Sequence, residues 1–267
     1  MKCLLRVSYA AVSHTAADIV AALIRRKPDA VLGLATGSSP EGLYAELIRR
    51  HREEGLDFSR LTTFNLDEYI GLHPSDPECY RWFMNDRLFQ HVNIDLRKTH
   101  LPDGLCRNWH QHCVDYEAMI ADAGGMDLLV LGIGRNGHLG FNEPVVSSFS
   151  SRTRPVMLTQ STRLANARCF GGQLDRVPRA AISMGLSTIA EARACLVLAT
   201  GNSKAKAVYA AIEGPQSAMV PASILQRHPN TTVILDEDAA FLLELSDFYK
   251  EVEEAEAEWE QSLAATT

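Results

Sequence analysis

The 267-residue sequence contains no hydrophobic run approaching the length of a membrane-spanning helix. Its first twenty residues, MKCLLRVSYAAVSHTAADIV, mix basic and apolar residues, but Ser13 and His14 interrupt them before a sustained apolar core develops. We therefore expect neither a signal peptide nor a membrane partner, and we expect a cytoplasmic location.

Cysteine is sparse and scattered along the chain. The six cysteines are Cys3, Cys79, Cys106, Cys113, Cys169 and Cys195. This background level predicts reduced thiols and not a disulfide framework. Segment 106–113, CRNWHQHC, combines two cysteines with two histidines, but no second ligand pair elsewhere completes a zinc site. We interpret the segment as the start of a helix and expect no metal.

An excess of basic residues is also missing, since the formal net charge is −7. This balance argues against a nucleic-acid partner, although the local charge of a pocket can still attract a small anion. Internal repeats and low-complexity linkers are absent too. With 46% hydrophobic and 22% charged residues, the composition is that of a globular chain able to bury a core.

What the sequence does contain is an alternation of short apolar runs with amphipathic helical stretches. The apolar runs are 30–35, 61–66, 127–133, 179–185, 194–200 and 231–236. Their nearly continuous hydrophobicity predicts parallel strands that are covered on both faces. Between the first two runs, Leu43, Tyr44, Leu47 and Ile48 fall on one face of a helix.

This alternation predicts an α/β fold, namely a Rossmann-like, doubly wound and mostly parallel sheet with helices on both faces. We expect a single domain over residues 1–267 that ends in a helix at about 238–261. The many glutamates of that last segment predict a solvated helix face and not a binding tail.

Segment 131–144, LGIGRNGHLGFNEP, directly follows one of the expected strands. Gly132, Gly134 and Gly137 match the spacing of a dinucleotide-binding fingerprint. However, the glycines run into a loop that ends at Pro144, whereas such a fingerprint requires a long helix. We therefore expect no nicotinamide cofactor.

His138 and Glu143 give this loop a different interpretation. Ligands of doubly wound sheets bind beyond the carboxyl ends of the strands, and His138 lies just past such an end. A carboxylate held near an imidazole orients the ring and supports its protonated form. The pair therefore favours proton-transfer chemistry over a structural histidine.

The turn between the first expected strand and its helix has the composition of an anion site. It consists of Thr36, Gly37, Ser38 and Ser39. Backbone N–H groups at a helix start, reinforced by hydroxyls, bind phosphate, and a simple serine cap would not require all four residues. Cations for the same phosphate could come from Lys204, in the equivalent turn TGNSKAKAV, and from Arg168.

The stretch TFNLDEYIGL, residues 63–72, places Asp67 and Glu68 at the end of the second expected strand. Adjacent residues of an extended chain point in opposite directions, so only one of the two carboxylates is expected to face a ligand. Such a carboxylate can act as the base for a carbon-bound proton next to a carbonyl. The spacing alone fits a solvated turn equally well.

Taken together, six segments resemble the glucosamine-6-phosphate deaminase (isomerase) family, in family order and over nearly the whole chain. They are GLATGSSPEGLY, TFNLDEYIGL, LGIGRNGHLGFNEP, SRTR, TRLANARCF and TGNSKAKAV. The resemblance implies conversion of glucosamine 6-phosphate and water to fructose 6-phosphate and ammonia, in amino-sugar catabolism. It also implies that the reaction needs no metal or organic cofactor.

By the same resemblance, His138 would open the sugar ring with the support of Glu143, and Asp67 would remove the proton from C2. The phosphate would be bound by the serine-rich turn and the two cations named above. These roles are expectations that the resemblance carries onto the matching positions.

Two positions depart from the family pattern. Asn136 stands where many members carry an aspartate, but its amide can still hydrogen-bond the imidazole, and we retain it as an orienting member of the site. Val156 follows shortly after SRTR, where allosterically activated members place a lysine. This change predicts weak or no activation by N-acetylglucosamine 6-phosphate.

Three alternatives remain open at this point. Deamination of galactosamine 6-phosphate would differ only at C4 of the sugar. A 6-phosphogluconolactonase, on a similar fold, has no C2 proton to remove, so Asp67 and Glu143 favour the deaminase. A non-catalytic sugar-phosphate sensor would be expected to lose its catalytic carboxylates, which are present here. A homo-oligomer is compatible with the sequence, which does not specify the number of copies.

Overall fold

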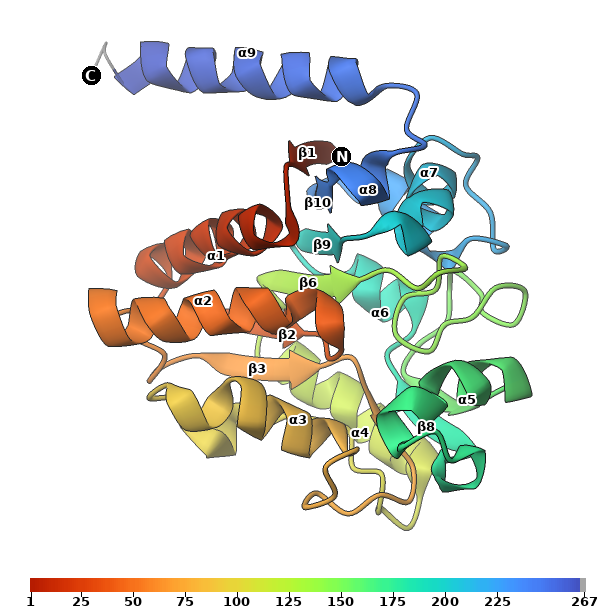
Figure 1. Cartoon of the computed structure of the whole chain (residues 1–267). Coiled ribbons are helices and arrows are strands. Elements are labelled where there is room, and N and C mark those ends of the chain that lie inside the picture. Colours follow the sequence, from red (N-terminus) through yellow and green to blue (C-terminus); the bar gives the residue numbers. More distant parts are fainter. Residues whose placement is uncertain (265–267) are drawn as a thin grey trace.

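The computed structural model describes residues 1–264, and its centre is a sheet of seven strands (Figure 1). In spatial order these are β1 (Lys2–Arg6), β10 (Thr231–Asp236), β9 (Cys195–Ala199), β6 (Leu128–Gly132), β2 (Val31–Leu34), β3 (Thr62–Asn65) and β5 (Thr99–His100). Every neighbouring pair is parallel. All of the predicted apolar runs except 179–185 lie in this sheet.

Helices cover both faces of the sheet. One face carries α1 (Tyr9–Arg26), α2 (Ser38–Glu54) and α3 (Tyr80–Arg87). The other carries α4 (Trp109–Asp122), α6 (Leu186–Ala190) and α7 (Ala205–Ile212). Within β6, Leu128 and Val130 face the first core, whereas Leu129 and Leu131 face the second. Because both sets are buried, the strand reads as a continuous apolar run. The predicted doubly wound fold is confirmed.

A second, antiparallel sheet lies beside the carboxyl ends of the large sheet. It consists of β4 (Asp67–Tyr69), β8 (Ala180–Ser183) and β7 (Arg154–Met157). A strand does form within the predicted run 179–185, but the prediction that it belongs to the parallel sheet was wrong. This strand, β8, pairs antiparallel with both of its neighbours, β4 and β7. Ala181 and Ile182 are fully buried, so this strand has the same apolar pattern as a strand of the parallel sheet.

The remaining elements are short except for the last helix. They are α5 (Gln160–Asn166), α8 (Glu237–Ala240), α9 (Ser246–Ala264) and 3-10 helices at Phe89–His91, Leu96–Lys98, Ala167–Phe170, Leu174–Arg176, Asn202–Lys204 and Pro221–Arg227. None of the helices within residues 1–264 is both long and apolar enough to cross a membrane.

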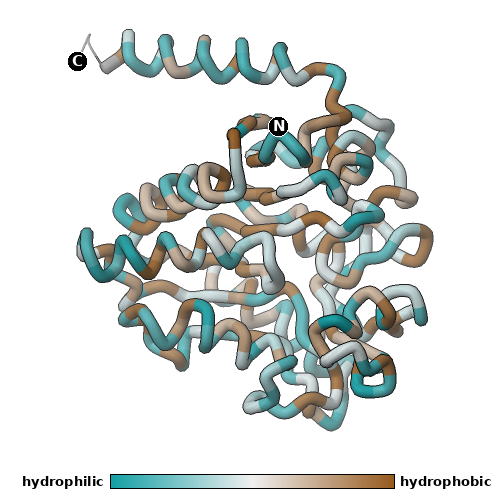
Figure 2. Tube along the Cα trace, viewed as in Figure 1, coloured by the Kyte–Doolittle hydropathy of each residue, from teal (hydrophilic) through white to brown (hydrophobic). Residues whose placement is uncertain are grey.

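The C-terminal helix differs from its predicted bounds of about 238–261. Asp236 caps the separate helix α8 by accepting from the Ala239 N–H at 2.8 Å, and the chain then turns at the buried Leu243 before α9 begins. Helix α9 lies beside the edge strand β1, to which Glu253 is joined by an ion pair with Arg6. Most other described residues of α9 are exposed. The helix is mainly hydrophilic along its length (Figure 2), in agreement with the predicted solvated face.

Candidate active site

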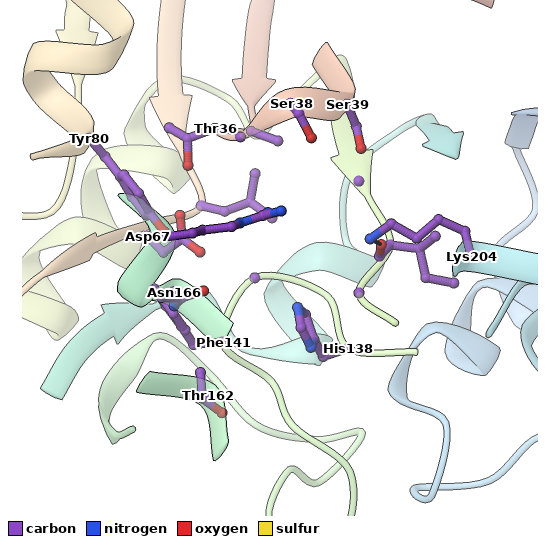
Figure 3. Close-up of a pocket in the computed structure, with 18 residues that line it drawn as sticks. Thr36, Ser38, Ser39, Asp67, Tyr80, His138, Phe141, Thr162, Asn166 and Lys204 are labelled. Atoms are coloured by element: carbon purple, nitrogen blue, oxygen red, sulfur yellow. Dashed lines mark hydrogen bonds between the residues drawn. The ribbon is translucent and has the colours of Figure 1, made fainter. Parts of the chain in front are cut away.

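One pocket lies between the carboxyl ends of the large sheet and the small antiparallel sheet (Figure 3). Its lining includes Thr36, Gly37, Ser38, Ser39, Asp67, Tyr80, His138, Phe141, Thr162, Asn166, Arg168 and Lys204. The structure thus brings together residues that are far apart in the sequence. Of the predicted site residues, Asn136 and Glu143 do not line the pocket and instead contact His138 from behind.

The serine-rich turn forms one end of the pocket. Gly37, with φ of 93°, precedes α2, and no side chain caps the first turn of that helix. The backbone N–H groups at the start of α2 are therefore available to a ligand. The hydroxyls of Ser38 and Ser39 lie at the same end, where Figure 3 shows them on the side of the pocket facing Lys204.

Positive charge gathers around Lys204, which lines the pocket together with Arg168. The Lys204 ammonium donates a 2.6 Å hydrogen bond to the Ile133 carbonyl. Burial lowers the pKa of Lys204, and the nearby charges of Arg135 and Arg168 lower it further. Concentrated positive charge next to a helix N-terminus is the arrangement that binds a phosphate. Arg135 was missed in the sequence because it stands among the glycines of the loop.

Asp67 lies on β4 and is only 6% exposed. Within residues 1–264 its carboxylate accepts no hydrogen bond, and it lines the pocket. Burial, followed by the charge of Glu68, raises the pKa of Asp67 to about 8. Glu68 does not line the pocket, so the structure decides which of the two adjacent carboxylates faces a ligand.

His138, Asn136 and Glu143 form a hydrogen-bonded chain. The Nδ1 atom of His138 lies 2.7 Å from Asn136 Oδ1 and 3.6 Å from Glu143 Oε1. The Asn136 amide donates to Glu143 Oε2 at 2.6 Å, and the Thr162 hydroxyl donates to Oε1 at 2.9 Å. Because Asn136 Oδ1 can only accept, Nδ1 carries the proton, which in the neutral ring leaves Nε2 free to accept one.

Glu143 remains ionised in this chain. Burial raises its pKa, but the hydrogen bond and charge of His138 and the hydrogen bonds from Asn136 and Thr162 outweigh burial and lower it to about 2. A permanently charged carboxylate behind the ring supports the imidazolium form when His138 takes up a proton.

Two glycines let the loop close on these side chains. A Cβ atom on Gly134 would lie 2.2 Å from the imidazole ring of His138. A Cβ on Gly140, with φ of 57°, would lie 3.0 Å from Ser183 Oγ and 3.3 Å from Asp67 Oδ2. Gly134 and Gly140 therefore let the backbone of the loop lie close to His138 and Asp67, respectively.

The aromatic and polar pocket residues that were not singled out from the sequence are Tyr80, Phe141, Thr162 and Asn166. Thr162 and Asn166 are four residues apart on α5, so helical spacing within TRLANARCF could have indicated them. Tyr80 carries no such signal, because it begins a helix well after Asp67 in the chain.

The cysteine-rich segment 106–113 forms the start of a helix, as predicted. Asn108 caps α4 by accepting from the Gln111 N–H, and His112 accepts from the Asp103 N–H. No group of three or more His, Cys, Asp or Glu side chains that could hold a metal is found within residues 1–264.

Comparison with known proteins places the chain in a family. A family model described as "Glucosamine-6-phosphate isomerases/6-phosphogluconolactonase" matches residues 6–234. The chain belongs to this family. Its relatives include the glucosamine-6-phosphate deaminase of Halothermothrix orenii, 48% identical over 91% of this chain and 100% of the relative. Glucosamine-6-phosphate deaminase 2 of Bacillus subtilis is 49% identical over 93% of this chain and 100% of the relative.

A solved structure at high identity agrees with this assignment, and a more distant one shares the fold. A monomeric glucosamine-6-phosphate deaminase superposes with a TM-score of 0.88 at 47% identity, over 91% of this chain and 100% of that chain. A 6-phosphogluconolactonase from Trypanosoma cruzi, with a TM-score of 0.72 at 19% identity over 91% of this chain and 97% of its own, shares the fold. The family resemblance seen in the sequence is confirmed.

Proposed function

We propose that this protein converts glucosamine 6-phosphate and water to fructose 6-phosphate and ammonia in the catabolism of amino sugars. One feature of the pocket supports this most directly: the unpaired, buried carboxylate of Asp67 faces the same space as His138 and an anion site. A lactone hydrolase has no carbon-bound proton to remove and would not need this base. The relatives that share almost half of the sequence are named deaminases, which supports the same choice.

The phosphate of the substrate binds at the start of α2. The N–H groups after Gly37 and the hydroxyls of Ser38 and Ser39 donate to its oxygens, while Lys204 and Arg168 balance its charge. Binding at this end orients the sugar so that its reacting carbons lie toward Asp67 and His138.

Ring opening comes first and involves His138. Nε2 of the neutral imidazole takes the proton of the anomeric hydroxyl and delivers a proton to the ring oxygen, which breaks the bond between C1 and that oxygen. Asn136 holds the required tautomer, and Glu143 stabilises the imidazolium that forms in between. The product is the open-chain aldehyde.

Asp67 then removes the C2 proton, which the neighbouring aldehyde has made acidic, while the aldehyde oxygen takes up a proton from water, and an enolamine forms. Because its pKa is raised to about 8, the carboxyl group can hold this proton and return it to C1 near neutral pH. Protonation at C1 gives an imine at C2, and water hydrolyses the imine to the ketone and ammonia. These steps are proton transfers and a hydrolysis, so they require no metal or organic cofactor.

The test is to supply glucosamine 6-phosphate and measure ammonia and fructose 6-phosphate in the same reaction. Equal amounts are expected, with less product from galactosamine 6-phosphate and none from 6-phosphogluconolactone. In deuterated water, Asp67→Asn should abolish exchange of the C2 hydrogen while substrate still binds. Ammonia without fructose 6-phosphate would contradict the isomerisation, and exchange at the wild-type rate in the variant would assign the base elsewhere.

We further propose that the protein acts in the cytoplasm as a single-domain enzyme, which fits its free thiols. Light scattering of the purified protein tests whether it forms a homo-oligomer. A partner beyond the sugar phosphate is not needed for the chemistry, because every proposed group comes from one chain.

A further inference from the structure

Glu68 does not line the pocket, and only 3% of the residue is exposed. Its Oε1 accepts hydrogen bonds from the backbone N–H groups of Tyr69 (2.8 Å) and Tyr80 (3.0 Å). Its Oε2 accepts from the N–H of Arg81 (2.9 Å) and from the thiol of Cys79 (3.1 Å). Burial raises the pKa of Glu68, and these hydrogen bonds oppose the shift. Because all four neighbours are donors, the arrangement fits the ionised carboxylate.

Three of the four donors belong to the start of helix α3. Cys79, the residue before the helix, makes no side-chain cap of its own. Glu68 supplies the cap from another element, and a negative charge at this end also interacts favourably with the helix dipole. The cap fixes the place where α3 begins, and Tyr80 is its first residue.

The Tyr80 ring forms a wall of the pocket next to Asp67 (Figure 3). It lies almost parallel to the ring of Phe141, with centroids 6.3 Å apart and an angle of 7° between the planes. Phe141 belongs to the loop that carries His138 and Glu143. Tyr80 therefore links β4, which carries Asp67, with the loop that carries His138.

We propose that Glu68 is a positioning residue of this reaction, which fixes the Tyr80 ring against the substrate by capping α3. The inference rests on the proposed deaminase function. Glu68 itself contacts neither substrate nor reacting atoms, and it acts through the position of Tyr80. An aromatic wall held in one place limits the orientations of the open-chain sugar over Asp67.

Glu68 also acts on Asp67 through its charge. The titratable and charged groups around Asp67 are Glu68, Tyr69, Tyr80, Tyr116, His138, Arg168 and Lys204. After burial, the charge of Glu68 is the cause that raises the pKa of Asp67. Removal of that charge should therefore make Asp67 lose its proton at a lower pH.

The test is Glu68→Gln, which keeps the size of the side chain and removes its charge. We expect kcat to fall about tenfold because the substrate is less well oriented. KM should change less than about threefold, since the phosphate site is untouched. The acid limb of kcat/KM should move to lower pH. A purely structural role would reduce the amount of folded enzyme but would leave that limb in place.

Asp86→Asn is the matched control. Asp86 is partly exposed and lies near the other end of α3, and its one ion pair within residues 1–264 is with Arg87, at 3.4 Å, so kcat and the pH profile should stay as in the wild type. Two further variants keep the test decisive if Glu68→Gln does not fold. Tyr80→Leu should show the same loss in kcat, whereas Tyr80→Phe, which keeps the ring, should remain within about threefold of the wild type.

The inference is overturned if folded Glu68→Gln retains the wild-type kcat or the wild-type acid limb, or if Tyr80→Leu retains the wild-type kcat. Failure of the proposed function would look different, because the wild-type protein would then release no ammonia from glucosamine 6-phosphate.

Discussion

The amide of Asn136 donates a 2.6 Å hydrogen bond to the carboxylate of Glu143. Its oxygen meanwhile lies 2.7 Å from Nδ1 of His138, so one uncharged side chain joins the imidazole to its carboxylate. A carboxylate in place of this amide would turn a donor into a second negative group facing Glu143.

Asn136→Asp should therefore add an ionisation to the acidic side of the kcat profile. Two carboxylates at this distance repel each other, which raises the pKa of at least one of them. The basic limb should also rise if the added charge stabilises the imidazolium. We expect the fold and substrate affinity to be kept, as checked by circular dichroism and binding. Superimposable kcat profiles of variant and wild type would show that residue 136 only shapes the loop.

Asp67→Asn should change how stability depends on pH. In the folded protein the pKa of Asp67 is raised from 3.8 to about 8, so the native state binds the proton more tightly than the unfolded state. The wild-type protein should lose stability as pH rises from about 4 to 8, and the variant should lose less. Between pH 5 and 8 the difference should grow by about 1 kcal/mol or more. Urea unfolding at several pH values measures it, and parallel curves would contradict the raised pKa.

Lys204→Ala should chiefly raise KM. Lys204 lies at the phosphate end of the pocket, beside the charges of Arg135 and Arg168. Some loss of kcat is also expected, because the phosphate positions the reacting carbons. The lysine forms no Schiff base in the proposed reaction, so borohydride reduction with substrate present should leave the chain unmodified. A covalent adduct on Lys204, detected by mass spectrometry, would assign it a different role.

Activation by N-acetylglucosamine 6-phosphate should be weak or absent. Val156 lies on β7 and packs against the small apolar cluster that contains Tyr69 and Phe141, so it offers an activator no charge. Arg152 belongs to the segment SRTR that precedes Val156, and its guanidinium is already paired with Glu117 and Glu191. Rate should depend on substrate concentration hyperbolically, with or without the compound. A sigmoidal curve that the compound makes hyperbolic would show that other residues supply the site.

The sequence predicted the central sheet because its strands are buried on both faces and carry an unbroken apolar signal. It did not predict β1 or β5, which lie at the edges, nor the partners of β8, since burial gives the same pattern in either sheet. The residues proposed for the chemistry follow the carboxyl ends of strands, so the sequence pattern was enough to predict them as site residues. Spacing alone could not decide between Asp67 and Glu68, because the choice depends on which side of β4 faces the pocket; only the family resemblance indicated Asp67.

The position of Tyr80 in the pocket could also not be predicted from the sequence. Its place depends on a cap supplied by Glu68, twelve residues earlier in the chain, and such a contact leaves no periodic pattern. Arg135 illustrates a second limit, since its charge acts on Lys204 across the fold. Local spacing indicates which segments meet at a sheet edge but does not report long-range electrostatics.

The two sheets hold opposite ends of the pocket. The serine-rich turn and Lys204 follow strands of the large sheet, whereas Asp67 belongs to the small one. A ligand whose phosphate binds at one end and whose carbon is deprotonated at the other must extend across the junction of the two sheets. The distance across the junction therefore selects the number of carbons between the phosphate and the reacting carbon. In the proposed reaction, an open-chain 2-amino sugar with its phosphate on C6 reaches Asp67 with C2. The pentose analogue, with its phosphate on C5, would place C2 one carbon short of the base.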